Sequence, residues 1–274
     1  MKVSKKIVAV LGAAFLLGAC AQPTSTPSKK EGKLNIMTTF YPIYDFTRNI
    51  VGDEGEVSLL IGAGTEPHEY DPTAKDIAKI SQSDALVYDN ENMETWVPTV
   101  MKSLTDSKVK EIKATKDMEL LPIEEEHEHE GEEHHDEHEH EFDPHVWLSV
   151  KNAQKVANGI AKGLEKVDSD NADYYKKNNK EFSTKLKKLK EDFAKELKKV
   201  KRKEIIVADK FPFKYMVKEL GLKYTAAFKS HTSDSETSAK AIKTLINKVK
   251  ASKIPVVYVV EMSNKKIAKA VSES

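Results

Sequence analysis

Three of the nine histidines stand apart from the others, in short segments whose composition suits a metal site. His68 lies in residues 64–72, directly after a predicted strand, and His145 lies in residues 143–147. Proline stiffens both segments, and a stiff loop holds a side chain at a site better than a flexible one. The neutral imidazole of histidine binds zinc, copper and nickel. His68 and His145 are therefore candidate metal ligands, and His231, in a loop after a later predicted strand, is a third.

Two carboxylates are placed where they could complete such a site. Asp209 follows the apolar run 205–208, and Glu261 follows the apolar run 256–260. Both runs are predicted strands, and ligands of open α/β sheets bind outside the carboxyl ends of strands. Each of these residues taken alone could be structural. Together with the two loop histidines they favour a metal site built from imidazoles and carboxylates.

The other six histidines lie in one acidic run, residues 124–142, which holds eleven acids and no Lys or Arg. They are His127, His129, His134, His135, His138 and His140. Phe142 is the only large apolar residue of the run, which therefore cannot build a core and is expected to be a solvated loop. A tract that only solubilises would not need six imidazoles. We expect a weak collector of several metal ions rather than one defined site.

The segments that must position these residues alternate between strands and helices. In the first part of the chain, strands are predicted at 34–39, 57–61, 85–88 and 109–112, and helices at 73–83 and 94–104. In the last part, strands are predicted at 204–208, 223–227 and 255–260, and helices at 213–220, 235–251 and from 265 onward. Such alternation predicts an α/β fold with mostly parallel sheets.

A long helical pattern lies between these two sets. A helix over 149–167, capped by Ser149, precedes residues 169–200, which contain neither Pro nor Gly. Apolar residues recur there at spacings of three and four, which predicts a single helix of about 30 residues, roughly 45 Å long. A coiled coil is the alternative for such a pattern. One copy in the middle of an α/β chain favours a spine that joins two lobes.

The N-terminus has the features of a targeting segment. Three lysines precede an apolar run over 7–17, which is too short to span a bilayer as a helix. Residues 17–20 (LGAC) are similar to a bacterial lipobox, in which the signal, residues 1–19, is removed and the thiol of Cys20 is lipidated. An ordinary secretory signal with a chance cysteine is the alternative. The rest of residues 20–33 is expected to be a flexible tether.

The composition excludes several classes of function. The chain has 44 Lys and Arg against 44 Asp and Glu, so it lacks the basic excess of a nucleic-acid binder. The single cysteine excludes a disulfide framework. The sequence contains no phosphate-binding glycine motif, zinc-protease motif or nucleophile elbow. A zinc hydrolase would need a base beside an open coordination position, and none stands out, so we expect a protein that is not an enzyme.

Residues 67–72 (PHEYDP) and 143–148 (DPHVWL), together with Glu261, resemble the zinc- and manganese-binding solute-binding lipoproteins of bacterial ABC importers. The acidic His-rich run just before DPHVWL resembles the zinc-uptake branch of that family. The resemblance covers nearly the whole chain. It implies two Rossmann-like lobes joined by one rigid helix, with the metal site in the cleft between the lobes. The corresponding parts are 34–167 for the N-terminal lobe, 168–200 for the linking helix and 201–274 for the C-terminal lobe.

The resemblance also assigns ligands by position. His68 and His145 match ligands from the N-terminal lobe, and Glu261 matches the acidic ligand from the C-terminal lobe. The third ligand of the family, usually His or Glu, falls on Lys210, and an ammonium group is a poor metal ligand. Asp209 or His231 would have to replace it, and the sequence does not decide between them.

The function implied by the resemblance is capture of Zn²⁺ outside the cell membrane and delivery to an ABC permease and its ATPase. The protein would be a monomer, anchored by lipid to the extracytoplasmic face of a Gram-positive membrane. Two imidazoles and two carboxylates also suit Mn²⁺ or iron, although the order of intrinsic affinities favours zinc. A surface adhesin and a metal buffer acting through the His-rich run are further alternatives. Relatives usually continue with another strand and helix, so we expect the C-terminal lobe, ending at Ser274, to be shortened.

Overall fold

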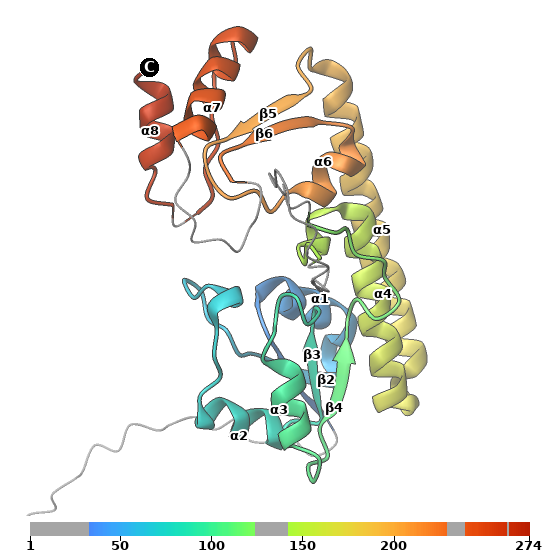
Figure 1. Cartoon of the computed structure of the whole chain (residues 1–274). Coiled ribbons are helices and arrows are strands. Elements are labelled where there is room, and N and C mark those ends of the chain that lie inside the picture. Colours follow the sequence, from blue (N-terminus) through green and yellow to red (C-terminus); the bar gives the residue numbers. More distant parts are fainter. Residues whose placement is uncertain (1–32, 124–141, 229–238, 262) are drawn as a thin grey trace, which may run out of the picture. The chain divides into compact units, whose positions relative to one another are not determined.

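Four parallel strands form the sheet of the first part of the chain (Figure 1). The computed structural model describes residues 33–123, 142–228, 239–261 and 263–274. The strands are β1 Leu34–Thr38, β2 Gly55–Leu59, β3 Ala85–Tyr88 and β4 Lys110–Lys113, in the order β2-β1-β3-β4. Because all four run in the same direction, their carboxyl ends meet at one edge, where the predicted ligand loops begin.

Helices cover both faces of this sheet, as the alternation of its side chains requires. Ile36 and Val87 point to a core shared with α1 (Tyr41–Val51) and α4 (Val150–Val167). Met37 and Leu86, one residue further or earlier along their strands, point to a second core with α2 (Ala74–Gln82) and α3 (Val97–Ser103). Successive residues of a strand face opposite sides, so β3 (Ala85–Tyr88), which is covered on both faces, consists of buried, largely apolar residues.

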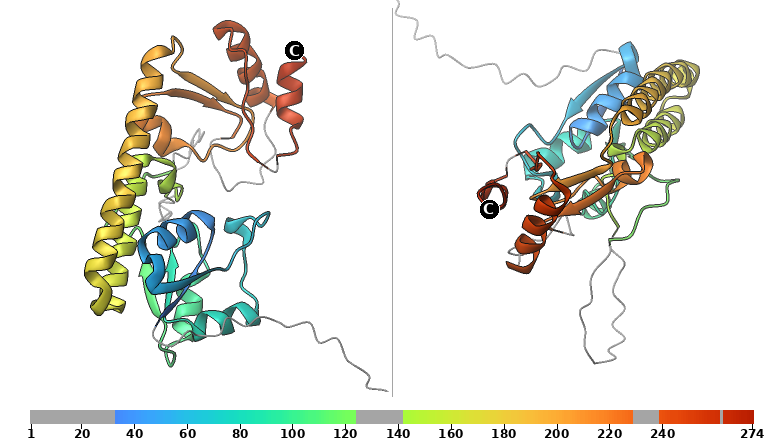
Figure 2. Two further views of the ribbon diagram at one scale, coloured as in Figure 1. Left: turned by 180° about the vertical axis from the view of Figure 1, so that it is seen from behind. Right: turned by 90° about the horizontal axis from the view of Figure 1, so that it is seen from above.

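The predicted long helix is α5, Ala172–Lys199, with 28 residues. It packs along α4 and, less extensively, on α1 (Figures 1 and 2). Ser149 caps α4 as expected, since its side chain accepts a hydrogen bond from the backbone N–H of Asn152. A short 3₁₀ turn, Ser169–Asn171, leads from α4 into α5.

A second parallel sheet follows α5. It contains β5 Glu204–Val207 and β6 Lys223–Ala226, with α6 (Lys214–Leu220) as the connection between them. One core of this part includes Val207 and Val217, from β5 and α6. The other joins Ile206 to α7 (Ala239–Ser252) and α8 (Lys266–Ser272). As in the first part, helices thus pack on both faces of a parallel sheet, which here has two strands in the described residues.

The sequence predicted no helix over α1, and it placed the second strand at 57–61, two residues beyond β2. Two further predicted elements differ more strongly from the structure. Residues 255–260 do not form a strand: only Tyr258 pairs with Val207, in an isolated parallel bridge. The reason is that Val256 and Tyr258 remain about half exposed, so little apolar burial supports pairing there. The helix predicted over 94–104 begins only at Val97, where Pro98 occupies the first turn, because proline favours that position.

Several expectations fall outside the described residues. They concern the signal over 1–19, Cys20 and most of its tether, the His-rich run up to residue 141, and His231. Within the described ranges, no helix is long and apolar enough to cross a membrane.

Candidate metal site

The structure brings His68 and His145 together at the carboxyl edge of the first sheet. Their Nε2 atoms are 3.2 Å apart and their ring centroids 5.1 Å apart. Two nitrogens that each lie 2.0–2.1 Å from a tetrahedral zinc ion are about 3.3 Å from one another. The observed separation therefore matches two imidazoles placed to share one ion, although 77 residues separate them in the chain.

His68 is presented by a short 3₁₀ turn, Pro67–Glu69, that follows β2. Glu66 caps this turn, since its side chain accepts a hydrogen bond from the backbone N–H of His68. Proline at the start of the turn fixes the backbone angle that the turn requires. The rigidity expected from the proline content of this loop thus has a structural basis.

Asp143 orients the second imidazole. Its Oδ1 accepts hydrogen bonds from Nδ1 of His145, at 2.8 Å, and from the backbone N–H of His145, at 3.0 Å. All three groups are buried. When Nδ1 carries the proton, the lone pair of Nε2 faces His68 and is available to a metal ion. Sequence reasoning gave Asp143 no role, although an aspartate two residues before its partner is a common local acceptor.

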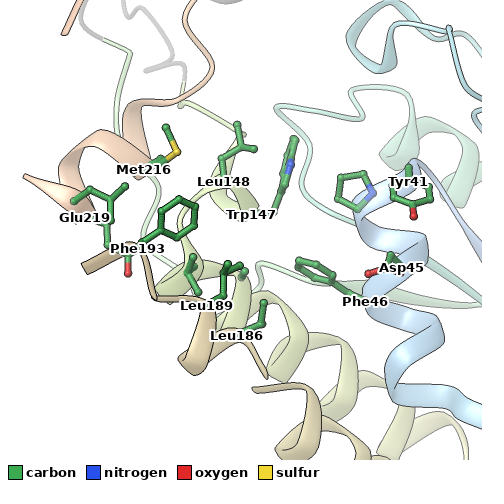
Figure 3. A pocket seen from close by; sticks show the side chains of 14 residues that line it. Tyr41, Asp45, Phe46, Trp147, Leu148, Leu186, Leu189, Phe193, Met216 and Glu219 are labelled. Atoms are coloured by element: carbon green, nitrogen blue, oxygen red, sulfur yellow. The ribbon is translucent and has the colours of Figure 1, made fainter. Parts of the chain in front are cut away.

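Aromatic rings support the same segment from behind. The Trp147 ring lies 5.5 Å from that of His145 and 4.8 Å from that of Phe40. Trp147 also lines an apolar cavity of about 330 Å³ (Figure 3). Figure 3 shows Phe46 of α1 on one side of Trp147 and Met216 of α6 on the other. The ligand loop is thus packed against elements from both parts of the chain.

The predicted carboxylate ligands lie elsewhere in the described structure. Asp209 follows β5, and its Oδ1 accepts a hydrogen bond from the backbone N–H of Lys210. Its Oδ2 is buried and has no hydrogen-bond partner among the described residues. Glu261 is exposed, in a turn. In the described ranges, no group of three or more His, Cys, Asp or Glu side chains is arranged to hold a metal ion, so the third and fourth ligands stay predictions.

A second pair of carboxylates occupies the switch point of the sheet, between the carboxyl ends of β1 and β3. Glu94 is fully buried and accepts hydrogen bonds from the Thr39 hydroxyl and from the backbone N–H groups of Asp89 and Asn90. Burial raises the pKa of Glu94 to about 7 despite these hydrogen bonds. Burial, followed by the charge of Glu94, also raises the pKa of Asp89 well above its ordinary value. These carboxylates were not identified from the sequence.

Two parallel sheets linked through one long helix, with paired imidazoles at a carboxyl edge, define a class of α/β proteins with a candidate metal site. The chain matches the family model ZnuA, zinc-uptake complex component A periplasmic, over residues 36–274, and it belongs to this family.

Named relatives agree with this assignment. The chain is 43% identical over 277 residues to the zinc-binding lipoprotein AdcA of Streptococcus pneumoniae, which matches 100% of this chain and 53% of AdcA. It is 41% identical over 262 residues to the high-affinity zinc uptake system protein ZnuA of Bacillus subtilis, covering 94% of this chain and 82% of that protein. The chain therefore spans about half the length of AdcA and most of the Bacillus protein.

A solved structure confirms the fold. The crystal structure of the Zn(II)-bound ZnuA-like domain of S. pneumoniae AdcA superposes with a TM-score of 0.72 at 42% identity. The match covers 88% of this chain and 84% of that domain. The expected α/β fold with a long linking helix is thus confirmed, and the family inferred from the sequence is correct.

Proposed function

We propose that this chain is a solute-binding lipoprotein that captures Zn²⁺ outside the cell membrane and delivers it to an ABC importer. The observation that carries the proposal is the 3.2 Å separation of the His68 and His145 Nε2 atoms, with Asp143 bound to the far nitrogen of His145. When both Nε2 atoms are unprotonated, this separation lets their lone pairs bind one zinc ion. The names of the relatives, which describe zinc binding and zinc uptake and no catalysis, support it.

The ion would be held by His68 and His145 and completed by oxygen or nitrogen ligands from the second part of the chain. Asp209, His231 and Glu261 are the proposed donors. The Oδ2 of Asp209 is buried and has no hydrogen-bond partner within the part of the chain that the structure describes, which supports a role for this residue, because a buried carboxylate oxygen without a partner is costly. The proposed partners are an ABC permease with its ATPase, and the proposed anchor is a lipid on Cys20, on the extracytoplasmic face.

Calorimetric titration with zinc tests the proposal. The protein is residues 21–274, with residues 124–141 replaced by a short Gly-Ser link so that the six clustered histidines do not contribute. Such a link is feasible because Pro122 and Phe142 pair in an antiparallel bridge. We expect one tight site per chain, lost in both His68→Ala and His145→Ala. Stoichiometric binding that survives both substitutions would contradict the proposed site.

The remaining ligands are resolved by the same titration. Asp209→Asn and Glu261→Gln keep side-chain size and remove the charge, so a loss of affinity in either identifies a ligand. His231→Ala tests the third donor. Competition with Mn²⁺ measures selectivity, and we expect zinc to prevail because two imidazoles favour it. Growth in zinc-poor medium, with the gene deleted and restored, tests the transport role against adhesion.

A further inference from the structure

Helix α6 contacts both ends of the segment that carries His145. The helix belongs to the second part of the chain and contributes Tyr215 and Glu219, which are four residues apart and so lie on one face. Tyr215 contacts Asp143, before the ligand, and Glu219 contacts Ser149, after it. The ligand segment is therefore fixed by a helix that is distant in sequence.

The Tyr215 hydroxyl joins two backbone segments. It donates a hydrogen bond to the carbonyl oxygen of Asp143, at 2.7 Å, and accepts one from the backbone N–H of Leu121, at 2.8 Å. Leu121 in turn accepts a hydrogen bond from the backbone N–H of Asp143, at 2.8 Å. The Tyr215 side chain is only 5% exposed and packs in the core of the first sheet. The hydroxyl thus closes a junction that neither backbone segment could complete alone.

This junction leads directly to the metal ligand. Asp143 is held through its carbonyl by Tyr215, and its carboxylate holds Nδ1 of His145 at 2.8 Å. Only Pro144, whose ring restricts the backbone, separates the two residues. A shift of the Asp143 backbone would therefore turn the imidazole whose Nε2 faces His68.

Glu219 fixes the other end of the segment. Its carboxylate accepts hydrogen bonds from the Ser149 hydroxyl, at 2.6 Å, and from the backbone N–H of Lys151, at 3.2 Å. Lys190 of α5 pairs with it at 3.0 Å. Burial acts to raise the pKa of Glu219, but the hydrogen bonds from Ser149 and Lys190 outweigh it and keep the pKa below its ordinary value. Glu219 is therefore an anion at the N-terminus of α4, where the helix dipole favours one.

We propose that Tyr215 is a positioning residue for the metal site: its hydroxyl fixes the backbone of Asp143, and through it the orientation of the His145 imidazole. Glu219 holds the opposite end of the same segment. The inference rests on the proposed function, because it assumes that His145 is a zinc ligand. Groups that orient a metal ligand typically contribute a factor of about 10 to 100 to metal affinity.

The test compares Tyr215→Phe with Tyr175→Phe in residues 21–274. Tyr175 is the matched control, because it is buried in the same core cluster and its hydroxyl donates to Asp168 at 2.6 Å, away from the two histidines. Long-range ¹H–¹⁵N NMR of the histidine rings reports the tautomer of His145 without metal. Titration with zinc, followed on the His68 and His145 ring signals against a competing chelator, gives the affinity of this site alone.

We expect Tyr215→Phe to mix the tautomers of His145 and to weaken zinc binding by about 10-fold or more. Tyr175→Phe should change neither. If both variants keep the wild-type tautomer and affinity, the positioning role is overturned while zinc capture stands. If the His68 and His145 signals of the wild type do not respond to zinc, the proposed function and the inference both fail. Should Tyr215→Phe not fold, Glu219→Gln acts on the same segment, and an unchanged His145 signal there overturns the inference.

Discussion

At the scale of single residues, the orientation of His145 depends on Asp143. One carboxylate oxygen binds both the backbone and the ring of the same histidine, which fixes the ring in two ways. If the Asp143 carboxylate were removed, water could not replace its hydrogen bonds efficiently, because both residues are buried. The imidazole would then rotate more freely and spend less time facing His68.

Asp143→Ala is accordingly expected to weaken zinc binding by about 10- to 100-fold. It should also lower the free energy of unfolding by about 1–3 kcal/mol, since the buried Nδ1–H loses its acceptor. Calorimetry and urea unfolding of the metal-free protein measure the two effects. Glu66→Ala, which removes only a 3.4 Å contact to the His68 backbone, should have a smaller effect on both. An equal effect of the two substitutions would contradict the special role of Asp143.

The buried pair Asp89 and Glu94 predicts a pH dependence of stability. A carboxyl whose pKa is raised on folding binds a proton in the folded state that the unfolded chain releases. Its contribution to stability is complete below the ordinary pKa and is lost as the pH rises through the raised one. For Glu94 this window runs from 4.5 to about 7.

The free energy of unfolding of the metal-free protein should therefore fall between pH 4.5 and 7, by up to about 1.4 kcal/mol per pH unit for each proton involved. Asp89→Asn removes one of the two groups and should flatten this slope. Asp117→Asn is the control, since Asp117 is 74% exposed in its pair with Lys162. Urea unfolding at several pH values measures the slope, and an identical slope in Asp89→Asn would refute the assignment.

The sequence could indicate a site residue only where the residue lies in a recognisable short motif. His68 and His145 lie in stiff motifs, and these motifs alone suggested a metal site. Tyr215 acts on residues 72 and 94 positions away, and no local pattern records such a contact. Glu94 was taken as part of a helix, whereas its importance arises from the burial that the sheet imposes.

At the scale of elements, α4 approaches the first sheet at a glycine. A Cβ added to Gly159 would lie 2.0 Å from the carbonyl oxygen of Ala114, just after β4. Real Cβ atoms do not tolerate such a distance, so the absence of a side chain lets the helix lie directly against the backbone there. Gly163, one turn later, would meet Ile112 at 2.3 Å in the same way.

Gly159→Ala should therefore destabilise the protein by about 1–3 kcal/mol, because overpacking outweighs the roughly 1 kcal/mol that alanine gains in a helix. Lys155→Ala on the exposed side of α4 serves as the control and should change stability little. Thermal unfolding of the two variants measures the difference. A stabilised Gly159→Ala would show that the helix can move away from the sheet at little cost.

The elements were predicted well where burial and local signals agree, and less well where they conflict. Residues 149–167 have both a Ser cap and an apolar stripe, and α4 follows them closely. Residues 255–260 are apolar like a buried strand, yet most of them have no partner strand in the described structure. An apolar run favours a strand, but strand pairing also depends on neighbouring segments that the run does not determine.

At the scale of the whole molecule, the contact of Tyr215 with the first core predicts one cooperative unfolding transition. Tyr215 belongs to the second part of the chain by sequence and to the core of the first sheet by packing. Trp96 lies in the second core of the first sheet, and Trp147 lies where α1 and α6 meet the ligand loop, so their fluorescence reports the first sheet and its contact with α6. We expect the fluorescence transition in urea to coincide with that of far-UV circular dichroism, which reports all helices. Two separate transitions would show that the parts unfold independently.

The position of Tyr215 also limits how such proteins can be recombined. A chimaera that exchanged everything after α5 for the corresponding part of a distant homologue would also exchange a piece of the recipient's own interior. The donor part would have to bring a tyrosine at the same place on α6, or leave a hole in the core and an amide of Leu121 without its acceptor. The first half of the chain ends in sequence before α6, but its core is completed by Tyr215 of α6. Exchange should succeed where the donor carries this tyrosine, or where α6 is kept together with the first half.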